Sequence, residues 1–566
     1  MEPVVVINDL KYRYRGQQEQ ALDGINLCLN RGEFVVVMGP SEAGKSTLAA
    51  TINGLIPNFH KGKLQGSVTV MGRDTQKHSV SQMAELVGMV FQDFEAQLFS
   101  TNVELEVAFA PENFAVERAE IKRRIDENLE YVGLNAVRRR PPSTLSGGQK
   151  QKLAIASVLA MKPSILVMDE PTTDLDPISK MGVFEITQRL CKREDLTLMI
   201  IEHETEEALS ADRVVLIDHG KIVLEGPARQ VLQDVDAMQR LGVMPLGIPR
   251  FFKTMGWKEL PLSPEEGKTA FQSAGWKVSQ AKYDQMVAAE HAALDRLNKP
   301  LIQCSGLEHV YKNGAVKALD GIDLEIFEGD MVAIVGQNGS GKTTLAKHFN
   351  GLLMPTAGEI IINGQPTRSQ GVFKLGQKVG YVFQNPDHQI FSETVFDEVA
   401  FSPRLRGLPE DTVKEYVTQA LEAVGLAGAE KEDPFALTKS GRQRVAVASV
   451  LAAKPEVLIL DEPTTGLDYA EQRGMMNMVR HLNEMGSTII FVTHHMWVVA
   501  EYARRVFVMK DGKILLRGTT REVFSHGEEL REAFLRPPHF VEFSNSIGHT
   551  FLTPEEMVQC IEGAQS

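Results

Sequence analysis

The chain contains 566 residues, too many for one ordinary hydrophobic core, so we expect two or more domains. Hydrophobic residues make up 43% of the sequence and charged residues 24%, which is typical of a soluble globular protein. The formal net charge of -14 argues against a general nucleic-acid binder, which normally carries a basic surface.

Cysteine usage and apolar content exclude further classes. The four cysteines are Cys28, Cys191, Cys304 and Cys560. They are far apart and lack metal-ligand or CxxC spacing, which favours reduced, structural thiols. The first residues, MEPVVVINDL, lack the features of a signal peptide, and no apolar run reaches the roughly 18–20 residues that cross a bilayer. Any membrane role is therefore expected to be peripheral and to depend on partners.

The sequence contains a long internal repeat. ALDGINLCLNRGEFVVVMGPSEAGKSTL, from Ala21, returns as ALDGIDLEIFEGDMVAIVGQNGSGKTTL, from Ala318. Met244–Glu266 is echoed weakly by Arg536–Glu556, so each copy is expected to end in its own small tail. The repeat predicts a first domain at 1–242, a first tail and connector at 243–298, a second domain at 299–527 and a second tail at 528–566. The connector around 273–298 is rich in Ala, Lys and Gln and is predicted to be helical, with a plain tether as the alternative.

Two glycine-rich loops follow short apolar runs. GPSEAGKS (39–46) follows FVVVM, and GQNGSGKT (336–343) follows MVAIV. Each precedes a helical segment, which is the context in which this pattern indicates a phosphate-binding P-loop. Backbone N–H groups of such a loop surround the phosphates, and the helix N-terminus favours negative charge. A single pattern can arise by chance, but two in the same register of a repeat exclude chance.

A third motif lies between the first P-loop and the apolar run that ends in DEPTT. Leu145 begins LSGGQ, which is followed by KQKLAIASVLA and ended by Lys162-Pro163. Ser146 is predicted to cap a helix here, and the glycines allow backbone N–H groups to approach an anion. An ordinary helix cap is the alternative for this motif in isolation.

Acidic pairs follow two apolar strands. They are Asp169-Glu170 and Asp461-Glu462, each followed by PTT. An aspartate at the end of a buried strand can lie beside Mg²⁺, and the following glutamate can orient or deprotonate the attacking water. The alternative is a solvated turn, which the upstream P-loops argue against.

Together these motifs resemble the ATP-binding cassette superfamily over nearly the whole chain. The resemblance implies an α/β fold of two tandem P-loop cassettes, each with a helical signature subdomain and a small C-terminal tail, that bind ATP and Mg²⁺ and hydrolyse ATP. The implied phosphate-binding residues are Gly39, Gly44, Lys45, Ser46, Thr47, Gly336, Asn338, Gly339, Gly341, Lys342, Thr343 and Thr344. The implied Mg²⁺ ligands are Ser46, Gln92, Asp169, Thr343, Gln384 and Asp461.

Other roles follow from the same resemblance. Glu170 and Glu462 are implied to be catalytic, together with the switch histidines His203 and His494. A buried capping side chain is the alternative for either histidine. Tyr14 and Tyr311 occupy the positions that stack on adenine, although Tyr12 competes with Tyr14.

The second signature is degenerate. The first signature contributes Ser146, Gly147, Gly148 and Gln149, and the second aligns Thr438, Lys439 and Ser440 with the first three of these. In this family the cassettes pack head to tail, so the second signature would face the first P-loop, where Glu42 replaces the glycine found at Gly339. We expect one efficient ATPase site at the second P-loop and a slow one at the first. The alternative is that these substitutions are tolerated drift and that the two sites are equally active.

The resemblance implies that Gln92 and Gln384, each in VFQ, are the Q-loop glutamines, and the motif that contains each of them narrows the family. FQDFEAQLFS (91–100) and FQNPDHQIFS (383–392) share the pattern FQ-x4-Q-[IL]-F, which resembles ATPases of energy-coupling factor (ECF) importers of vitamins and transition-metal ions. That resemblance implies a membrane coupling (T) subunit and a substrate-binding (S) subunit as partners, and a peripheral location on the cytoplasmic face of the membrane. The segments around Gln97 and Gln389 would receive coupling helices, or else simply pack on the cassette core.

Two other kinds of tandem cassette protein are alternatives. Sugar-importer ATPases are also fused pairs but are not expected to repeat this pattern in both halves. Ribosome-acting factors have long charged linkers and basic surfaces, whereas this connector is short and the chain is acidic. The transported molecule is not encoded in these motifs.

Overall fold

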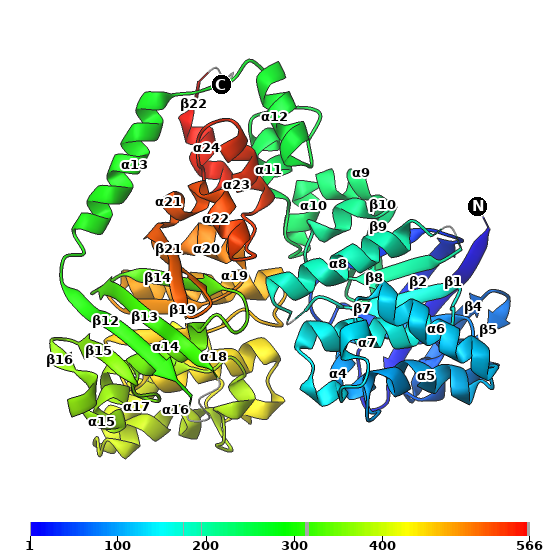
Figure 1. The fold of residues 1–566 in the computed structure, drawn as a ribbon, viewed down its shortest axis with the longest axis horizontal. Helices are drawn as coiled ribbons and strands as arrows, with labels where there is room; N and C mark the ends of the chain where they lie inside the picture. Colours follow the sequence, from blue (N-terminus) through cyan, green and yellow to red (C-terminus); the bar gives the residue numbers. More distant parts are fainter. Residues whose placement is uncertain (1, 174, 194, 312–315, 563–566) are drawn as a thin grey trace. The chain divides into compact units, whose positions relative to one another are not determined.

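A computed structural model describes residues 2–173, 175–193, 195–311 and 316–562. The chain divides into two compact units (Figure 1). Unit 1 comprises Met1–Pro249 with Asp468–Ala470, and unit 2 comprises Arg250–Leu467 with Glu471–Ser566.

Unit 1 contains an antiparallel sheet and a larger, mainly parallel sheet. Their strand orders are β2-β1-β4-β5 and β10-β9-β3-β8-β7-β6. The strands are β1 (Pro3–Tyr14), β2 (Leu22–Asn30), β3 (Phe34–Met38), β4 (Gly62–Val70), β5 (Arg73–Asp74), β6 (Val87–Val90), β7 (Ile165–Asp169), β8 (Thr197–Ile201), β9 (Arg213–Asp218) and β10 (Lys221–Pro227). Every residue of β3, β7 and β8 is buried, because helices and the second sheet cover both faces; this explains their continuous apolar sequences.

The helices of unit 1 surround this core. They are α1 (Lys45–Ile52), α2 (Leu55–Asn58), α3 (Val80–Ala84), α4 (Phe94–Gln97), α5 (Val103–Asn113), α6 (Arg118–Tyr131), α7 (Gly147–Leu159), α8 (Pro177–Cys191), α9 (Ala228–Gln233) and α10 (Val235–Arg240). Helices α5, α6 and α7 contact one another and form the helical subdomain that contains the signature.

Unit 2 repeats this architecture, with strand orders β13-β12-β15-β16 and β17-β18-β19-β14-β20-β21. The strands are β12 (Pro300–Val310), β13 (Lys317–Phe327), β14 (Met331–Gly336), β15 (Ala357–Ile362), β16 (Gln365–Pro366), β17 (Val379–Val382), β18 (Val457–Asp461), β19 (Thr488–Val492), β20 (Arg505–Lys510) and β21 (Lys513–Thr519). The helices are α14 (Lys342–Phe349), α15 (Gly371–Lys378), α16 (Val395–Leu405), α17 (Glu410–Ala423), α18 (Lys439–Leu451), α19 (Tyr469–Glu484), α20 (Met496–Tyr502), α21 (Thr520–Ser525) and α22 (Gly527–Glu532). The duplication confirms the predicted α/β fold of two tandem cassettes.

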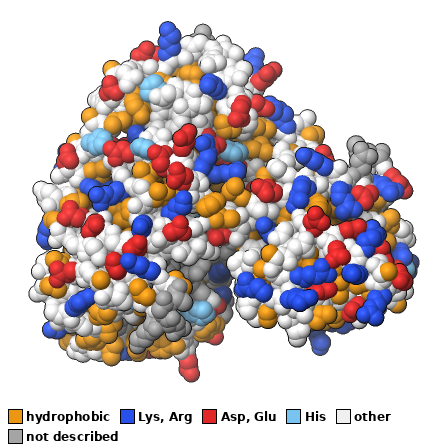
Figure 2. Space-filling view, in the orientation of Figure 1, with side chains coloured by type: hydrophobic (Ala, Val, Ile, Leu, Met, Phe, Trp, Pro, Cys, Tyr) orange, Lys and Arg blue, Asp and Glu red, His pale blue; other side chains and the backbone are white. Residues whose placement is uncertain are grey.

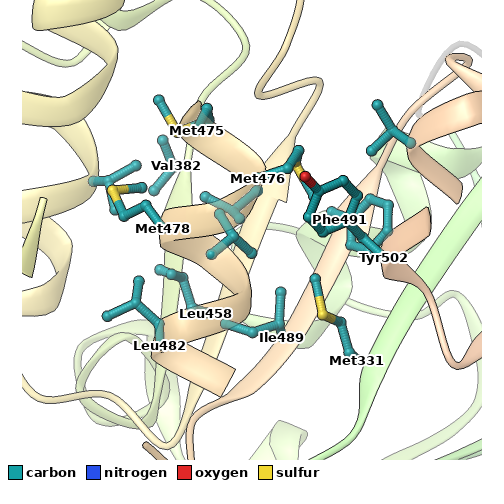
Figure 3. Packing of buried hydrophobic residues seen from close by; sticks show 14 of the residues in the cluster. Met331, Val382, Leu458, Met475, Met476, Met478, Leu482, Ile489, Phe491 and Tyr502 are labelled. Atoms are coloured by element: carbon teal, nitrogen blue, oxygen red, sulfur yellow. The ribbon is translucent and has the colours of Figure 1, made fainter. Parts of the chain in front are cut away.

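One face of the large sheet in unit 2 is covered by α19. Met475 and Met476 of this helix are fully buried and belong to the same apolar cluster as Leu458 and Phe491 of the sheet (Figure 3). The packing fixes β18 and β19, the strands that end at the acidic pair and just before the switch histidine.

The tail segments of the two copies form one small substructure, which belongs to unit 2 from Arg250 onward. Their elements are α11 (Gly247–Thr254), α12 (Pro264–Ser273), β11 (Lys277–Val278), α13 (Gln280–Asp295), α23 (His539–Ser546), α24 (Pro554–Cys560) and β22 (Ile561–Glu562). Helix α12 packs on α23, and β11 pairs antiparallel with β22. Aromatic rings from both segments, including Phe251 and Phe543, meet at 6.0 Å. The sequence assigns one tail to each copy, whereas the two share a common aromatic core from Arg250 onward.

Candidate nucleotide-binding sites

The two P-loops have nearly the same backbone. Gly44 and Gly341 precede α1 and α14 in the left-handed region, with φ of 101° and 103°. A Cβ at Gly44 would lie 2.3 Å from the carbonyl oxygen of Ala21, and one at Gly341 would lie 2.5 Å from that of Ala318. Only glycine fits both the φ angle and the space, so the loop geometry explains these two residues.

Each P-loop folds around a buried lysine. Lys45 Nζ donates to the carbonyl oxygens of Gly39 (3.0 Å) and Pro40 (2.8 Å). Lys342 Nζ donates to the backbone in the same way, to Gly336 at 2.8 Å. Both ammonium groups are thus held within the loops where the terminal phosphates of ATP are expected.

The first P-loop departs from the second at Glu42. This exposed residue has φ of 61°, and Gly339 has φ of 81° at the matching position. A left-handed conformation costs a non-glycine residue about 1 kcal/mol. The first loop therefore keeps the backbone shape while adding strain and a negative charge beside the phosphate site.

Hydroxyl and carboxylate oxygens converge at the end of the central strands. Ser46 Oγ donates to Asp169 Oδ1 at 3.1 Å, and Thr343 Oγ1 donates to Asp461 Oδ1 at 3.4 Å. Among the described residues, no group of three His, Cys, Asp or Glu side chains could hold a metal ion. A hydroxyl with one carboxylate nevertheless suits Mg²⁺, which keeps waters and takes further oxygens from substrate phosphates.

The buried aspartates have perturbed pKa values. Burial raises the pKa of Asp169 to about 6, opposed by the hydrogen bond from Ser46 and aided by the negative charge of Glu170. Burial also raises the pKa of Asp461, where a hydrogen bond from Tyr381 is the largest opposing effect.

The glutamate of each acidic pair contacts the predicted switch histidine. His203 Nε2 lies 2.7 Å from Glu170 Oε1, and His494 Nδ1 lies 2.6 Å from Glu462 Oε2. Gln92 Nε2 also donates to Glu170, at 2.9 Å, and both Gln92 and Gln384 lie exposed just after β6 and β17. The structure therefore brings the predicted catalytic residues of each copy together.

Both glutamates have left-handed backbones, with φ of 48° at Glu170 and 52° at Glu462. Such strain in non-glycine residues is concentrated at functional sites. In both copies the residue with this backbone conformation is the one whose carboxylate contacts the histidine.

The signature helices differ at their N-termini. Ser146 caps α7, and Gln149 returns a hydrogen bond to the backbone of Ser146, which completes a capping box. Thr438 caps α18, but glycine at position 441 has no side chain to return the bond. A Cβ at Gly466 would lie 2.0 Å from Lys439 Nζ, so the lysine side chain lies over this loop of its own cassette.

The structure separates the competing tyrosines. Tyr12 is fully buried and donates to the carbonyl of His60 at 3.2 Å, as a core residue does. Tyr14 Oη instead lies 3.1 Å from Thr47 Oγ1 on the P-loop helix, and Tyr311 makes the same 3.1 Å contact with Thr344. Tyr311 is 44% exposed, whereas Tyr12 is fully buried.

A comparison with known protein families agrees with the presence of one such site in each copy. Residues 22–173 and 319–465 match the ABC transporter family. The chain belongs to the ABC transporter family. It is an ATP-binding component of such a transporter and an ATPase, as predicted. Among the described residues, no helix has the length and apolar character needed to cross a membrane.

Relatives extend over the whole chain. Two examples carry the name "Putative ABC transporter ATP-binding protein". The one from Caldanaerobacter subterraneus subsp. tengcongensis is 56% identical over 560 residues, 98% of each chain. The one from Methanosarcina mazei is 38% identical over 546 residues, 95% of this chain and 92% of the relative. Among solved structures, cbiO1 from Clostridium perfringens, part of the ABC transporter complex cbiONQ, is 38% identical and covers 43% of this chain and 98% of its own, with a TM-score of 0.39.

Sequence reasoning missed one residue that contacts the site. Tyr381 Oη donates to Asp461 Oδ2 at 2.6 Å. The signal was present in the repeat, because VGYVFQ in the second copy aligns with VGMVFQ in the first.

Proposed function

We propose that this ABC ATPase drives an ECF-type importer of a small micronutrient, such as a vitamin, a vitamin precursor or a transition-metal ion. The proposed partners are a membrane coupling (T) subunit and a substrate-binding (S) subunit, so that contact with the cytoplasmic face of the membrane is indirect. The observation that supports this proposal is the local structure of the FQ-x4-Q-[IL]-F motif in each unit.

The second glutamine of the motif braces the Q-loop. Gln97 Oε1 accepts from the backbone N–H of Phe91 at 3.3 Å, and Gln389 Oε1 accepts from that of Phe383 at 3.2 Å. Gln389 Nε2 also donates to the carbonyl of Ala446 on the signature helix, at 2.9 Å. A displacement of the motif would therefore move the Q-loop and, in unit 2, the signature helix as well.

The final phenylalanine of the motif is held outward. Phe99 is 61% exposed and Phe391 is 63% exposed, although both belong to apolar segments. Each ring packs edge-on against an exposed phenylalanine of the following helix, at 4.6 Å for Phe109 and 4.9 Å for Phe401. We name Phe99–Phe109 and Phe391–Phe401 the aromatic pairs.

A buried glutamate fixes each aromatic pair. Glu106 accepts from the backbone N–H groups of Phe99 (3.1 Å) and Ser100 (2.7 Å). Glu398 accepts from Phe391 and Ser392 at 3.0 Å each. Rigid exposed aromatic side chains favour a docking surface for an apolar partner segment, and the coupling helices of a membrane subunit provide such a segment.

Charge supports the exclusion of nucleic acid. Lysine and arginine are interspersed with aspartate and glutamate over the face shown in Figure 2, and the net charge is -14. A ribosome-binding surface would instead concentrate basic side chains.

We propose further that the two ATP sites are unequal. The efficient site would consist of Lys342, Thr343, Gln384, Asp461, Glu462 and His494 with Leu145–Gln149. The slow site would combine Lys45, Ser46, Gln92, Asp169, Glu170 and His203 with the altered second signature. Glu42, Lys439 and the incomplete cap of α18 support this inequality.

Affinity purification from detergent-solubilised membranes tests the partner. The tagged chain is expected to recover integral membrane subunits, and Phe99→Ala with Phe391→Ala is expected to lose them while the isolated chain keeps its ATPase activity. Met485→Ala, at a side chain that is 59% exposed outside the motif, is the matched control. Co-sedimentation with ribosomes, or recovery of a sugar-type importer, would overturn the proposal.

A further inference from the structure

Tyr381 is a buried polar residue within the apolar strand β17. Its side chain is 7% exposed, and its hydroxyl donates to Asp461 Oδ2 at 2.6 Å. The first copy has Met89 at this position, and a thioether cannot donate a hydrogen bond.

Strand pairing explains how Tyr381 reaches the aspartate. β17 and β18 are parallel, and Tyr381 lies opposite Ile459. Asp461 follows two residues later and points to the same face of the sheet. The tyrosine side chain therefore extends along the face to the strand end, and the ring of Phe383 packs beside it at 5.1 Å.

The two oxygens of Asp461 have separate partners. Oδ2 accepts the short bond from Tyr381, while Oδ1 lies 3.4 Å from Thr343 Oγ1. Holding Oδ2 fixes the plane of the carboxylate and leaves Oδ1 directed at the P-loop hydroxyl. In the first copy Asp169 Oδ1 likewise accepts from Ser46, but Met89 provides no donor for the second oxygen.

We propose that Tyr381 is a positioning residue that orients the Asp461 carboxylate for Mg²⁺, and that Met89 leaves the metal site of the first copy weaker. The inference rests on the proposed role of Asp461 as a Mg²⁺ ligand. Groups that orient a metal ligand through a hydrogen bond typically contribute a factor of about 10–100 to metal affinity.

Manganese binding tests the inference without measuring turnover. The full-length chain, saturated with a non-hydrolysable ATP analogue, is titrated with Mn²⁺ while free Mn²⁺ is followed by electron paramagnetic resonance. The wild type is expected to show a tighter and a weaker class of site. Tyr381→Phe, which removes one oxygen and keeps the ring, is expected to weaken the tighter class by about 10-fold or more.

Three variants besides Tyr381→Phe make the outcome decisive. Asp461→Asn is expected to remove the tighter class; if it does not, the proposed metal role of Asp461 is wrong. If Asp461→Asn removes it and Tyr381→Phe leaves it unchanged, the tyrosine inference alone is wrong. Met89→Tyr is expected to tighten the weaker class, which keeps the test available if Tyr381→Phe fails to fold, and an unchanged weaker class would overturn the inference. If Tyr381→Met weakens binding and Tyr381→Phe does not, ring packing replaces the hydrogen bond as the cause and the inference is also overturned.

Discussion

His494 Nδ1 lies 2.6 Å from Glu462 Oε2. Burial acts to raise the pKa of Glu462, but the charge of His494 and its hydrogen bond, with Lys342, lower it to about 2. The glutamate is therefore ionised at neutral pH and can accept a hydrogen bond from an attacking water. His203 and Glu170 form nearly the same contact in the first copy, at 2.7 Å, so these pairs do not separate the two sites. The copies do differ in their signatures, at Glu42 and at Tyr381, and these differences support the proposed inequality.

Glutamine substitutions test that inequality. Glu462→Gln is expected to nearly abolish steady-state ATPase activity of the purified chain, because the efficient site loses its carboxylate. Glu170→Gln is expected to leave most of the activity. A removed catalytic group commonly costs a factor of about 10²–10⁴ at its own site. Binding of a fluorescent ATP analogue serves as the control for folding, and equal losses from the two variants would show equivalent sites.

The raised pKa of Asp169 predicts a pH-dependent effect on stability. Because the folded-state pKa is about 6 against an ordinary value of 3.8, the contribution of Asp169 to stability is greatest below its unfolded pKa and is lost as pH rises through 6. Asp169→Asn is expected to stabilise the chain in EDTA at pH 8 by on the order of 2 kcal/mol. Thermal melting at pH 8 and pH 5.5 measures this, with a smaller gain expected at pH 5.5. A gain that is equal at both pH values would contradict the assignment.

The repeat and its motifs predicted the cassettes and the P-loops because each depends on local sequence, and the family resemblance named the glutamates and histidines without predicting that they contact each other. Glycine at positions 44 and 341, for example, is required by the loop itself. Tyr381 was missed because its role depends on the pairing of β17 with β18, which is not written in either strand alone.

The sequence predicted less about the two tails. The weak echo between them predicted their existence but not their association. Phe251 and Phe543 are 292 positions apart in the chain, and no local pattern specifies that their rings meet at 6.0 Å. Such contacts follow from tertiary packing of apolar side chains rather than from a motif.

Glu42 is predicted to weaken nucleotide binding at the first P-loop through its charge. Glu42→Gln is expected to tighten ATP binding about threefold, since an exposed charge contributes up to about 1 kcal/mol. Glu42→Gly adds relief of the left-handed strain and is expected to tighten binding further. Titration with a fluorescent ATP analogue in a Lys342→Ala background isolates this site. The gain from Glu42→Gln is expected to shrink at high salt, and identical affinities for all three chains would contradict the prediction.

Restoring the second signature is predicted to activate the slow site. Thr438→Ser, Lys439→Gly, Ser440→Gly and Gly441→Gln together recreate SGGQ and allow the capping box seen at Ser146. In a Glu462→Gln background, residual ATPase activity is expected to rise by at least about 10-fold, because one lost donor to a developing anion costs about 10²–10³ in rate. The same four changes in a Glu462→Gln, Glu170→Gln chain are the control and should give no gain. An unchanged rate in the first background would mean that the signature does not limit the slow site.

The shared tail core is predicted to stabilise unit 2 independently of nucleotide binding. Phe543 is fully buried, and its ring contacts Phe251 and Phe252 at 6.0 and 5.8 Å. Phe543→Ala is expected to lower the free energy of unfolding by about 3–5 kcal/mol, because it removes buried apolar area and leaves a cavity. Phe534→Ala, at a ring that is 40% exposed, is the matched control and should change stability little. Urea denaturation measures both variants, and ATP-analogue binding by the folded Phe543→Ala chain should remain near that of the wild type. Equal destabilisation by the two substitutions would show that the aromatic core contributes no more than an exposed ring.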